Sequence, residues 1–363
     1  MGKTVLFLVN HDVVIYNFRL EIVERLIADG HDVHISSPYG ERIDDLVALG
    51  AKFHDISMER HGMNPFREFK LIGEYKKLFR EIGPDICLGF TIKPNIYGAI
   101  AARKLGIPFV ANITGLGTAV ENPGLSQRIL VLLYKYAFRG IRRVFFQNEE
   151  NRRFFADRNI AVRAHAMLPG SGVNLSRYPY MPYPCGDRIR FAFISRIMKE
   201  KGTDQYLEAA EIIKRTHPEA EFHVCGFAED EYSGRLGELH AKGIVNYHGM
   251  IRDVAGFMAE MNCIVHPTYY PEGISNVLLE ACATGRPIIT TDRSGCREVV
   301  EDGVNGFVVE AKNTQSLVSV LEKFIALPDE EKERLGRNGR AKVEREFDRN
   351  IVVEKYVREV ENA

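Results

Sequence analysis

Short apolar runs alternate with amphipathic segments along the whole chain, and this alternation constrains the fold more than any other feature. In the first half, the runs typical of buried strands lie at 5–9, 33–36, 86–90, 109–113 and 143–147. Helical patterns fall between them, at 17–29, 44–49, 66–81, 97–105 and 127–139. Strands that alternate with helices predict a parallel sheet covered by helices on both faces.

The second half repeats this pattern. Strands are expected at 189–195, 221–225, 246–248, 263–266, 287–291 and 306–309, and helices at 202–216, 251–260, 275–283, 315–326 and 329–346. Two α/β domains are therefore predicted, 1–172 and 173–346, and the stretch 173–187, which contains three prolines, is interpreted as the linker. Ligands of open α/β sheets bind beyond the carboxyl ends of the strands, so the expected site is a cleft between the domains.

Charge and cysteine content narrow the class of partner. The 363 residues include 48 Lys and Arg against 49 Asp and Glu, and this balance gives no overall field for binding nucleic acid. Residues 101–184 nevertheless contain 12 basic and 4 acidic side chains, which favours an anionic partner for the first half. The six cysteines form no Cys-x-x-Cys and lie mostly in apolar runs, as buried thiols of a reducing compartment do.

The sequence lacks the motifs of targeting segments and of several enzyme classes. The run at 5–9 is too short for a signal peptide and no stretch of about 18 apolar residues occurs, so we expect a cytoplasmic protein, at most peripheral to a membrane. The first strand leads into Asn10-His11-Asp12, not Gly-x-Gly-x-x-Gly, which argues against a dinucleotide dehydrogenase. No His-Glu-x-x-His, Gly-x-Ser-x-Gly or Asp-x-Asp is present, so peptidase, α/β-hydrolase and Asp-x-Asp metal sites lack support.

Two cations follow the first strand expected in the second domain. Arg196 and Lys201 are five residues apart and precede a helix, where they can flank a diphosphate and neutralise the charge that grows on it as it leaves. The alternative is a solvated basic loop.

A second signal surrounds the helix expected at 275–283. Glu272 precedes this helix, Ser275 or Asn276 can cap it, and its free N–H groups favour an anion such as a phosphate. Glu280 lies in the apolar middle of the helix, and a carboxylate there needs a partner. Ribose hydroxyls of a ligand and an internal Arg or Lys are both possible partners.

These residues together resemble the donor site of the retaining GT-B glycosyltransferases, in their large fourth sequence family. The resemblance rests on Arg196, Lys201, Glu272 and Glu280 and on the flanking segments 247–250, 265–273 and 295–307. The first domain has a looser resemblance to bacterial enzymes that add N-acetylgalactosamine or a related sugar to polyprenyl-diphosphate-linked saccharides. Its segments are Tyr16-Asn17-Phe18-Arg19, Met63-Asn64-Pro65-Phe66, Lys93-Pro94-Asn95, Thr114-Gly115-Leu116-Gly117 and Gly172-Val173-Asn174-Leu175.

The resemblance implies a GT-B fold, in which two Rossmann-like, doubly wound parallel-sheet domains face each other across a cleft and the final helix, about 347–363, packs back on the first domain. It implies that Arg196 and Lys201 hold the nucleotide diphosphate, that Glu280 takes the ribose hydroxyls and that Glu272 contacts the transferred sugar. No metal and no cofactor is implied. The other donor-binding residues implied are Gly273, Ile274, Ser275, Asn276 and Met250, and the acceptor-binding residues are Arg19, Lys93, Asn95, Gly115 and Gly117.

One departure concerns the general base. Many members of the family carry a His near the reacting carbon, where this chain reads Asn112-Ile113-Thr114-Gly115. His11 and Asp12 end the first strand and are either near the cleft or ordinary loop residues, so no base is assigned. The resemblance allows the leaving phosphate to take the acceptor proton instead.

The segment 127–143 is the expected membrane contact. Arg128, Lys135, Arg139 and Arg142 are predicted to share one helical face beside a broad apolar face. Such a helix lies on an anionic membrane surface or packs in the core with a solvated basic stripe.

We therefore expect a retaining, metal-independent glycosyltransferase that moves a hexose or N-acetylhexosamine from a UDP-sugar to a polyprenyl-diphosphate-linked saccharide in surface polysaccharide synthesis. Its expected partners are the nucleotide sugar, the lipid-linked acceptor and the cytoplasmic membrane surface through 101–184, with no nucleic acid. The alternatives are a GDP-mannose donor or a soluble acceptor and, from another class, an inactive nucleotide-binding scaffold.

Overall fold

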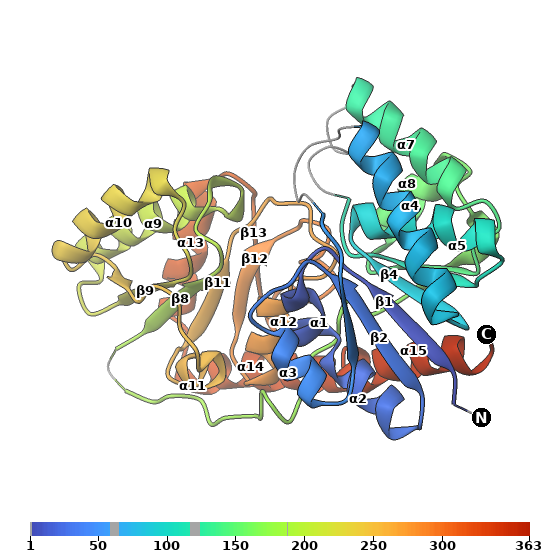
Figure 1. The fold of residues 1–363 in the computed structure, drawn as a ribbon. Coiled ribbons are helices and arrows are strands. Elements are labelled where there is room, and N and C mark those ends of the chain that lie inside the picture. Colours follow the sequence, from blue (N-terminus) through green and yellow to red (C-terminus); the bar gives the residue numbers. More distant parts are fainter. Residues whose placement is uncertain (1, 59–64, 117–123, 187) are drawn as a thin grey trace. The chain divides into compact units, whose positions relative to one another are not determined.

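The computed structural model describes residues 2–58, 65–116, 124–186 and 188–363, which form two units (Figure 1). Unit 1 consists of Met1–Ser171 and Arg349–Ala363, and unit 2 of Gly172–Asp348. The boundaries expected from the sequence were 1–172 and 173–346. The last helix, α15 (Arg349–Glu361), is part of unit 1.

Unit 1 is built on a seven-stranded parallel sheet in the order β3-β2-β1-β4-β5-β6-β7. Its strands are β1 (Thr4–Leu8), β2 (Asp32–Ser37), β3 (Lys52–Asp55), β4 (Ile86–Phe90), β5 (Phe109–Ile113), β6 (Arg143–Phe146) and β7 (His165–Met167). Its other helices are α1 (Asp12–Phe18), α2 (Leu20–Ala28), α3 (Ile43–Ala48), α4 (Pro65–Ile82), the π-helix η1 (Pro94–Gly98), α5 (Ala99–Leu105), α7 (Leu125–Ala137), α8 (Glu149–Asp157) and the 3₁₀-helix η2 (Val162–Ala164).

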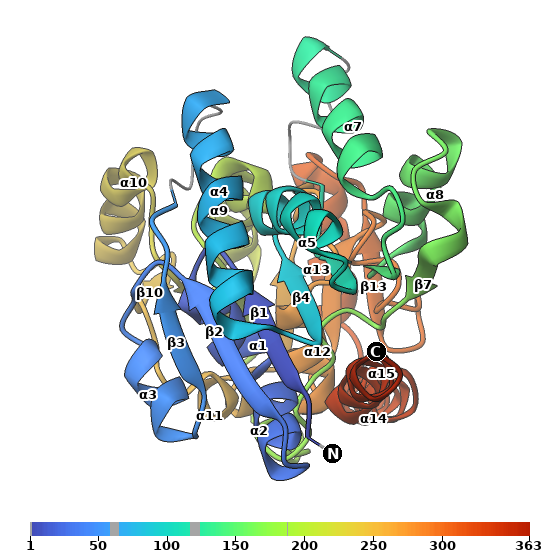
Figure 2. The ribbon, with the colours of Figure 1, turned by 45° about the vertical axis from the view of Figure 1, so that its right-hand side comes forward.

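The period-two alternation of β1 sets the two faces of this sheet. Leu6 and Leu8 pack with α4, α5, α7 and α8, whereas Val5 and Phe7 pack with α1, α2, α3 and α15. Figures 1 and 2 show these two groups of helices on opposite faces. Both faces of the central strands are therefore buried, which is why they form continuous apolar runs in the sequence.

Unit 2 repeats the plan with six parallel strands in the order β10-β9-β8-β11-β12-β13. The strands are β8 (Arg190–Ile194), β9 (Glu221–Cys225), β10 (Asn246–Tyr247), β11 (Cys263–His266), β12 (Ile288–Thr291) and β13 (Gly306–Val309). The helices are the 3₁₀-helix η3 (Lys199–Lys201), α9 (Thr203–Thr216), α10 (Asp230–Ala241), α11 (Val254–Ala259), α12 (Asn276–Ala283), α13 (Thr314–Ile325) and α14 (Asp329–Glu346). Phe191 and Phe193 face α9, α10 and α13, and Ala192 faces α11, α12 and α14.

Two expectations are corrected by the structure. The helix expected at 17–29 is α2, which begins only at Leu20, because Arg19, with φ −140° and ψ 6°, separates it from α1, to which Asn17 and Phe18 belong. The segment 173–187 is not a free linker: the buried Arg286 donates hydrogen bonds to the carbonyl oxygens of Met181 at 2.6 Å and Pro182 at 2.7 Å, and so holds the segment on unit 2. The pattern also did not predict β3, β7, α8 or α10.

Each sheet has one position where the strand order reverses. In unit 1 this switch point lies between β1 and β4, and in unit 2 between β8 and β11. Loops that leave neighbouring strands in opposite directions open a crevice at such a point, where open α/β sheets bind ligands. None of the helices that the structure describes is long and apolar enough to cross a membrane.

Candidate functional site

The switch point of unit 2 brings together two residues that are far apart in the sequence. β8 pairs with β11, Phe191 opposite Cys263, so their carboxyl ends lie side by side. Lys201 ends η3 after β8, and Glu272 follows β11. The Lys201 ammonium donates a hydrogen bond to Oε1 of Glu272, and the two side chains are only 14% and 15% exposed. The structure thus pairs the predicted cation with the predicted carboxylate.

The two loops that carry this ion pair are fastened to each other. The Tyr269 N–H donates to the Glu200 carbonyl oxygen at 2.9 Å, and the Thr268 hydroxyl donates to the same oxygen at 3.2 Å. Gly202 has φ +79°, and a Cβ there would lie 2.2 Å from the Pro267 carbonyl oxygen. Only glycine fits this position, because it needs both a positive φ and a close backbone approach.

His266 is the third member of the cluster, which we call the Lys201–Glu272–His266 cluster. Its Nε2 lies 3.4 Å from Oε1 of Glu272, and its side chain is buried at the end of β11. Burial alone would raise the pKa of Glu272, but Lys201 and His266 together outweigh it and lower that pKa to about 2. Burial lowers the pKa of His266 itself. A neutral imidazole beside a carboxylate and an ammonium is the state expected near neutral pH.

Sequence reasoning assigned no role to His266. The signal was present, because a polar side chain closing the buried strand Cys263–His266 faces the same edge as Glu272. His266 entered the sequence analysis only as part of the flanking segment 265–273.

Arg196 lies on the same loop but outside the cluster. Its side chain is half exposed, its Nε donates to Sδ of Met198 at 3.0 Å, and Glu229 is 4.0 Å away. The guanidinium is therefore held loosely and is accessible to an anionic ligand.

The amino end of α12 presents backbone groups more than side chains. Ile274 is buried in the core of unit 2, and Ser275 is buried with its hydroxyl unpaired among the described atoms. The expected side-chain cap by Ser275 does not form, although Ser275 is the N-cap residue. Asn276 and Glu280 lie one turn apart on the half-buried face of α12, as the predicted ribose contact requires.

Two exposed apolar side chains flank the loops after β9 and β10. Met250, which was predicted, is 75% exposed, and Phe227, which was not, is 62% exposed. The Gly226 N–H donates to the Gly249 carbonyl oxygen at 2.8 Å and holds the two loops together.

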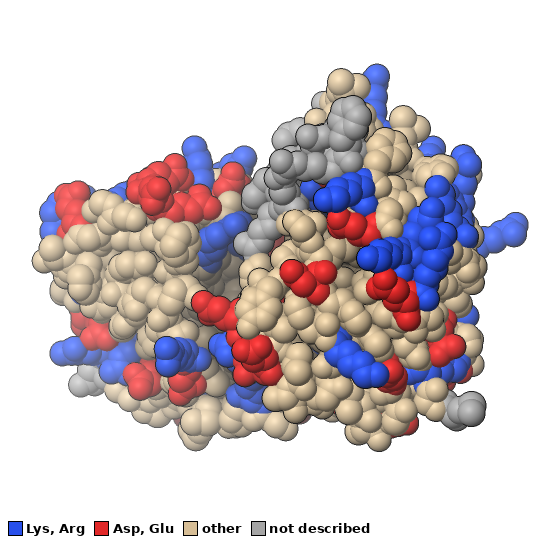
Figure 3. Space-filling model, viewed as in Figure 1, with Lys and Arg blue, Asp and Glu red and all other residues tan. Residues whose placement is uncertain are grey.

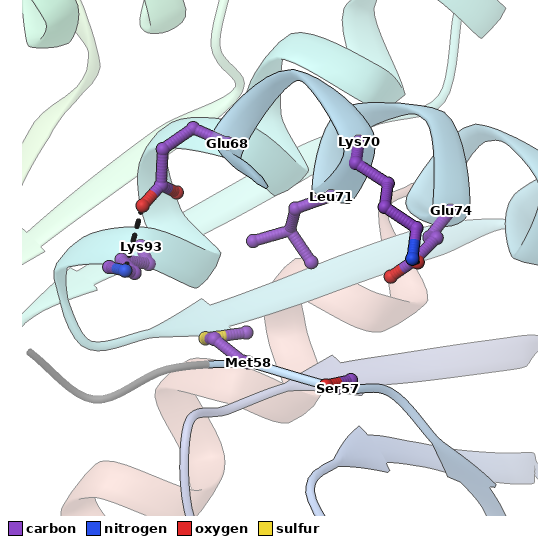
Figure 4. A pocket seen from close by; sticks show the side chains of 7 residues that line it. All are labelled: Ser57, Met58, Glu68, Lys70, Leu71, Glu74 and Lys93. Carbon is purple, nitrogen blue, oxygen red and sulfur yellow. Dashed lines mark ion pairs between the residues drawn. The ribbon is translucent and has the colours of Figure 1, made fainter. Parts of the chain in front are cut away.

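The acceptor residues predicted in unit 1 are only partly brought together. Lys93 follows β4, and its Nζ is 2.7 Å from Oε1 of Glu68, with both side chains largely buried (Figure 4). Asn95 is buried and donates from Nδ2 to the Asn112 carbonyl oxygen at 2.8 Å. Gly115 follows β5, the neighbour of β4. Gly117 lies outside the described residues, as do Met63 and Asn64.

Arg19 is a correction. Its side chain is buried, its guanidinium lies over the Phe90 ring at 5.2 Å, and it hydrogen-bonds to Tyr356 of α15. Burial lowers its pKa. An arginine buried in this way cannot bind an acceptor. It packs instead between the α1–α2 junction and α15.

The expected basic face of 127–143 is also corrected. The helix α7 ends at Ala137, so Arg139 and Arg142 are not on it. Arg142 and Arg143 bind Glu359 of α15 at 3.0 Å and 2.6 Å, which uses part of the basic excess of 101–184 within the fold. Arg128 and Lys135 remain as exposed cations of α7.

Among the residues that the structure describes, neither a general base for catalysis nor a metal-binding site is evident. His11 caps α1 by accepting from the Val13 N–H at 3.2 Å, and Asp12 accepts from the Arg42 N–H at 2.7 Å, so both hold local structure. Among the described residues, no group of three or more His, Cys, Asp and Glu is placed to hold a metal ion.

Two doubly wound sheets in one chain, each with a switch point, are the architecture of a two-domain protein with Rossmann-like halves. Comparisons with known proteins define the class further. The family model described as glycosyl transferases group 1 matches residues 185–342, and glycosyl transferase 4-like matches residues 4–148.

Curated relatives and solved structures agree with these matches. The chain is 26% identical to N,N'-diacetylbacillosaminyl-diphospho-undecaprenol alpha-1,3-N-acetylgalactosaminyltransferase of Campylobacter jejuni, over 97% of this chain and 96% of the relative. It is 27% identical to the capsular polysaccharide biosynthesis glycosyltransferase CapM of Staphylococcus aureus, over 92% and 90%. The structure of Anabaena HepE with UDP and glucose superposes with a TM-score of 0.81 at 17% identity, covering both chains fully.

The chain belongs to the GT-B glycosyltransferases, and the family resemblance expected from its motifs is confirmed. A glycosyltransferase from Rickettsia africae shares the fold with a TM-score of 0.83 at 17% identity, over 99% of this chain and 98% of the other.

Proposed function

We propose that the protein transfers a sugar from a UDP-sugar to a polyprenyl-diphosphate-linked saccharide, with retention of anomeric configuration. The observation that carries the proposal is the buried Lys201–Glu272–His266 cluster at the switch point of unit 2, with Arg196 on the same loop. A buried ion pair at a ligand-binding edge is costly to maintain and is a common sign of a functional site.

The chemistry follows from where the charges lie. As the glycosyl bond breaks, negative charge grows on the leaving diphosphate, and Lys201, Arg196 and the N–H groups of 273–276 neutralise it. The pKa of Glu272, about 2, keeps its carboxylate ionised, so it can stabilise positive charge that develops on the sugar. In this proposal, fixed cations and N–H groups neutralise the charge on the diphosphate, and no metal ion or cofactor is included.

The acceptor is assigned to unit 1. The Campylobacter jejuni relative is named for transfer to a diphospho-undecaprenol-linked sugar, and it matches over nearly the whole chain. Lys93, at the switch point of unit 1, supplies a cation for the acceptor diphosphate. Asn95 anchors the turn that carries Lys93.

We also propose that α7 contacts the cytoplasmic membrane surface. Leu125, Ile129, Leu132 and Tyr136 recur at helical spacing and are each 40% exposed or more, so their stripe is not part of the core. The cations Arg128 and Lys135 border this stripe. Figure 3 shows further Lys and Arg side chains gathered over the part of unit 1 where α4 lies. Apolar and basic side chains side by side are typical of helices that lie on anionic membranes.

The donor assignment is tested by thermal stabilisation with a panel of UDP- and GDP-sugars. One or more UDP-sugars should raise the melting temperature of the wild type. The variant Lys201→Ala should lose most of this shift, and Lys199→Ala, which changes an exposed lysine on the same turn, should keep it. A shift with GDP-sugars alone, or one that Lys201→Ala leaves intact, contradicts the proposal.

A further inference from the structure

Two hollows in unit 1 meet at one side chain, Glu68 of α4. The first has a volume of about 400 Å³, and its lining includes Lys93, Lys70 and Glu74 together with Ser57 and Met58 (Figure 4). The second has a volume of about 410 Å³, and Glu68 lines it as well. Glu68 thus stands between a polar hollow and its neighbour.

The second hollow is an apolar groove formed by four helical segments, α4, η1, α5 and α7. Its apolar lining comes from Phe69 and Ile72 of α4, Tyr97 of η1, Ile100 of α5, and Ile129 and Leu133 of α7. Apart from Glu68 and the hydroxyls of two tyrosines, its lining is hydrocarbon. A groove of this size is within the range of small-ligand sites, roughly 300–1,000 Å³, and its walls suit an alkyl or isoprenoid chain.

The polar hollow is lined by an ion pair, and a phosphate ligand can take the place of the carboxylate in this pair. Lys93 and Glu68 are 2.7 Å apart, with side chains 17% and 10% exposed. The hydroxyl of Tyr97, which lines the apolar groove, hydrogen-bonds to Glu68. A phosphate offers Lys93 the same kind of oxygen that Glu68 now supplies, with more negative charge.

The backbone below Lys93 is built for this position. Thr91, which follows β4, has φ +70°, an uncommon conformation for threonine, and the π-helix η1 begins at Pro94. Residues with a strained backbone and short π-helical segments both occur preferentially at functional sites. Lys93 lies between these two features, lines the polar hollow and pairs with Glu68 of α4.

We propose that the two hollows form one site for an isoprenoid diphosphate, with the diphosphate on Lys93 in place of Glu68 and the hydrocarbon chain in the groove between α4, α5 and α7. The inference rests on the proposed function, because it locates the lipid part of the acceptor. The chemistry of the two linings decides the occupant. The cation Lys93 lines the polar hollow, the groove is lined almost entirely by hydrocarbon, and Glu68, the partner of Lys93, lines both.

Chain length supplies the first test. Farnesyl diphosphate and dimethylallyl diphosphate have the same headgroup, and calorimetry on the full-length protein compares their affinities. The wild type should bind farnesyl diphosphate at least tenfold more tightly. Ile129→Asn and Phe69→Asn, both at partly exposed groove positions, should remove most of this difference, and Leu132→Asn, on α7 outside the groove lining, should keep it.

The ion pair supplies the second test. Glu68→Gln frees Lys93 and should tighten farnesyl diphosphate and inorganic pyrophosphate by a similar factor, threefold or more, whereas Lys93→Gln should weaken both. A purely structural ion pair would instead make the two variants change affinity in the same direction, or not at all. Opposite signs are therefore the result that supports the site, and any other pattern overturns it.

Failure of this site and failure of the proposed function give different results. All of these variants lie in unit 1, so UDP-sugar stabilisation, which reports on unit 2, should be unchanged in them. Unaltered chain-length discrimination in Ile129→Asn and Phe69→Asn, with donor binding intact, would overturn the isoprenoid site alone. Loss of donor binding in the wild type would overturn the function.

Discussion

At the scale of single residues, Glu272 depends on Lys201 and His266 for its charge. Burial opposes ionisation, and the two neighbours reverse that effect. The folded pKa of about 2 lies below the ordinary value of 4.5, so ionised Glu272 stabilises the fold above about pH 4.5, and this stabilisation is lost as the pH falls from 4.5 towards 2.

This dependence predicts a pH effect on stability. Glu272→Gln removes the titrating group, so the excess unfolding free energy of the wild type over the variant should be largest at neutral pH, on the order of 3 kcal/mol, and should shrink below pH 4.5. Urea unfolding at pH 7, 5 and 4 measures it. Glu331→Gln, which breaks an exposed pair with Arg334, is the control and should change stability by less than about 1 kcal/mol at every pH. A pH-independent difference for Glu272→Gln contradicts the account of the cluster.

Gly202 gives a second prediction at this scale. Gly202→Ala should lower the unfolding free energy by at least about 2 kcal/mol more than Gly243→Ala. Both glycines have positive φ, but a Cβ at Gly243 meets nothing within 4 Å, whereas one at Gly202 meets the Pro267 carbonyl oxygen. Equal losses in the two variants would show that the two loops are not in tight contact.

The sequence could identify Lys201 and Glu272 but not how they are paired. Their residue types and neighbours indicated a donor site, and the adjacency of β8 and β11 is what brings them together. Glu68 was not noticed, because its importance depends on a cation 25 positions away that only the fold places beside it. Arg19 was misassigned because the sequence indicated that the last helix returns to unit 1 but not that its Tyr356 would contact Arg19.

At the scale of elements, the central strands were predictable and the edge strands of unit 1 were not. β4, β5, β9 and β11 have the expected bounds because strands covered on both faces are continuously apolar. β3, at the edge of its sheet, has two exposed and two half-buried residues and no apolar run. The helix α8 was missed because of its polarity: five of its nine residues are charged.

The helix α7 was predicted with the wrong boundary, and the corrected helix makes its own prediction. Leu132→Gln and Leu125→Gln should reduce binding to anionic vesicles several-fold in flotation, because each removes an exposed apolar side chain from the stripe. The control Val47→Gln changes a similarly exposed apolar residue on α3, on the other face of the sheet, and should have no effect. Unchanged flotation of both α7 variants contradicts membrane contact by this helix.

At the scale of the whole molecule, a net charge of −1 conceals an uneven distribution. Residues 185–363 have 24 basic and 31 acidic side chains, and yet they contain the candidate donor site, which uses two placed cations and backbone N–H groups. Bulk charge is therefore a poor guide to the nucleotide site. Within the basic excess of 101–184, Arg142 and Arg143 pair with Glu359 of α15. Arg103, Arg128 and Lys135 lie on α5 and α7, two of the helices that line the apolar groove.

The two proposed substrates are assigned to different units. Unit 2 has the cluster that suits a nucleotide diphosphate, and unit 1 has the ion pair and groove that suit a lipid diphosphate. Transfer needs both substrates to be bound. A variant that disables the binding site in one unit should therefore abolish transfer and leave binding of the other substrate intact.

The most direct measurement is mass spectrometry of a polyprenyl-diphosphate-linked saccharide acceptor after incubation with each UDP-sugar that stabilises the enzyme. With at least one donor, the acceptor should gain the mass of one sugar residue, and the product should keep the anomeric configuration of that donor. Transfer by Lys201→Ala should be at least a hundredfold slower than by the wild type, and Lys199→Ala should be close to the wild type. Transfer by Lys201→Ala at the wild-type rate, or a product of inverted configuration, would contradict the proposed function.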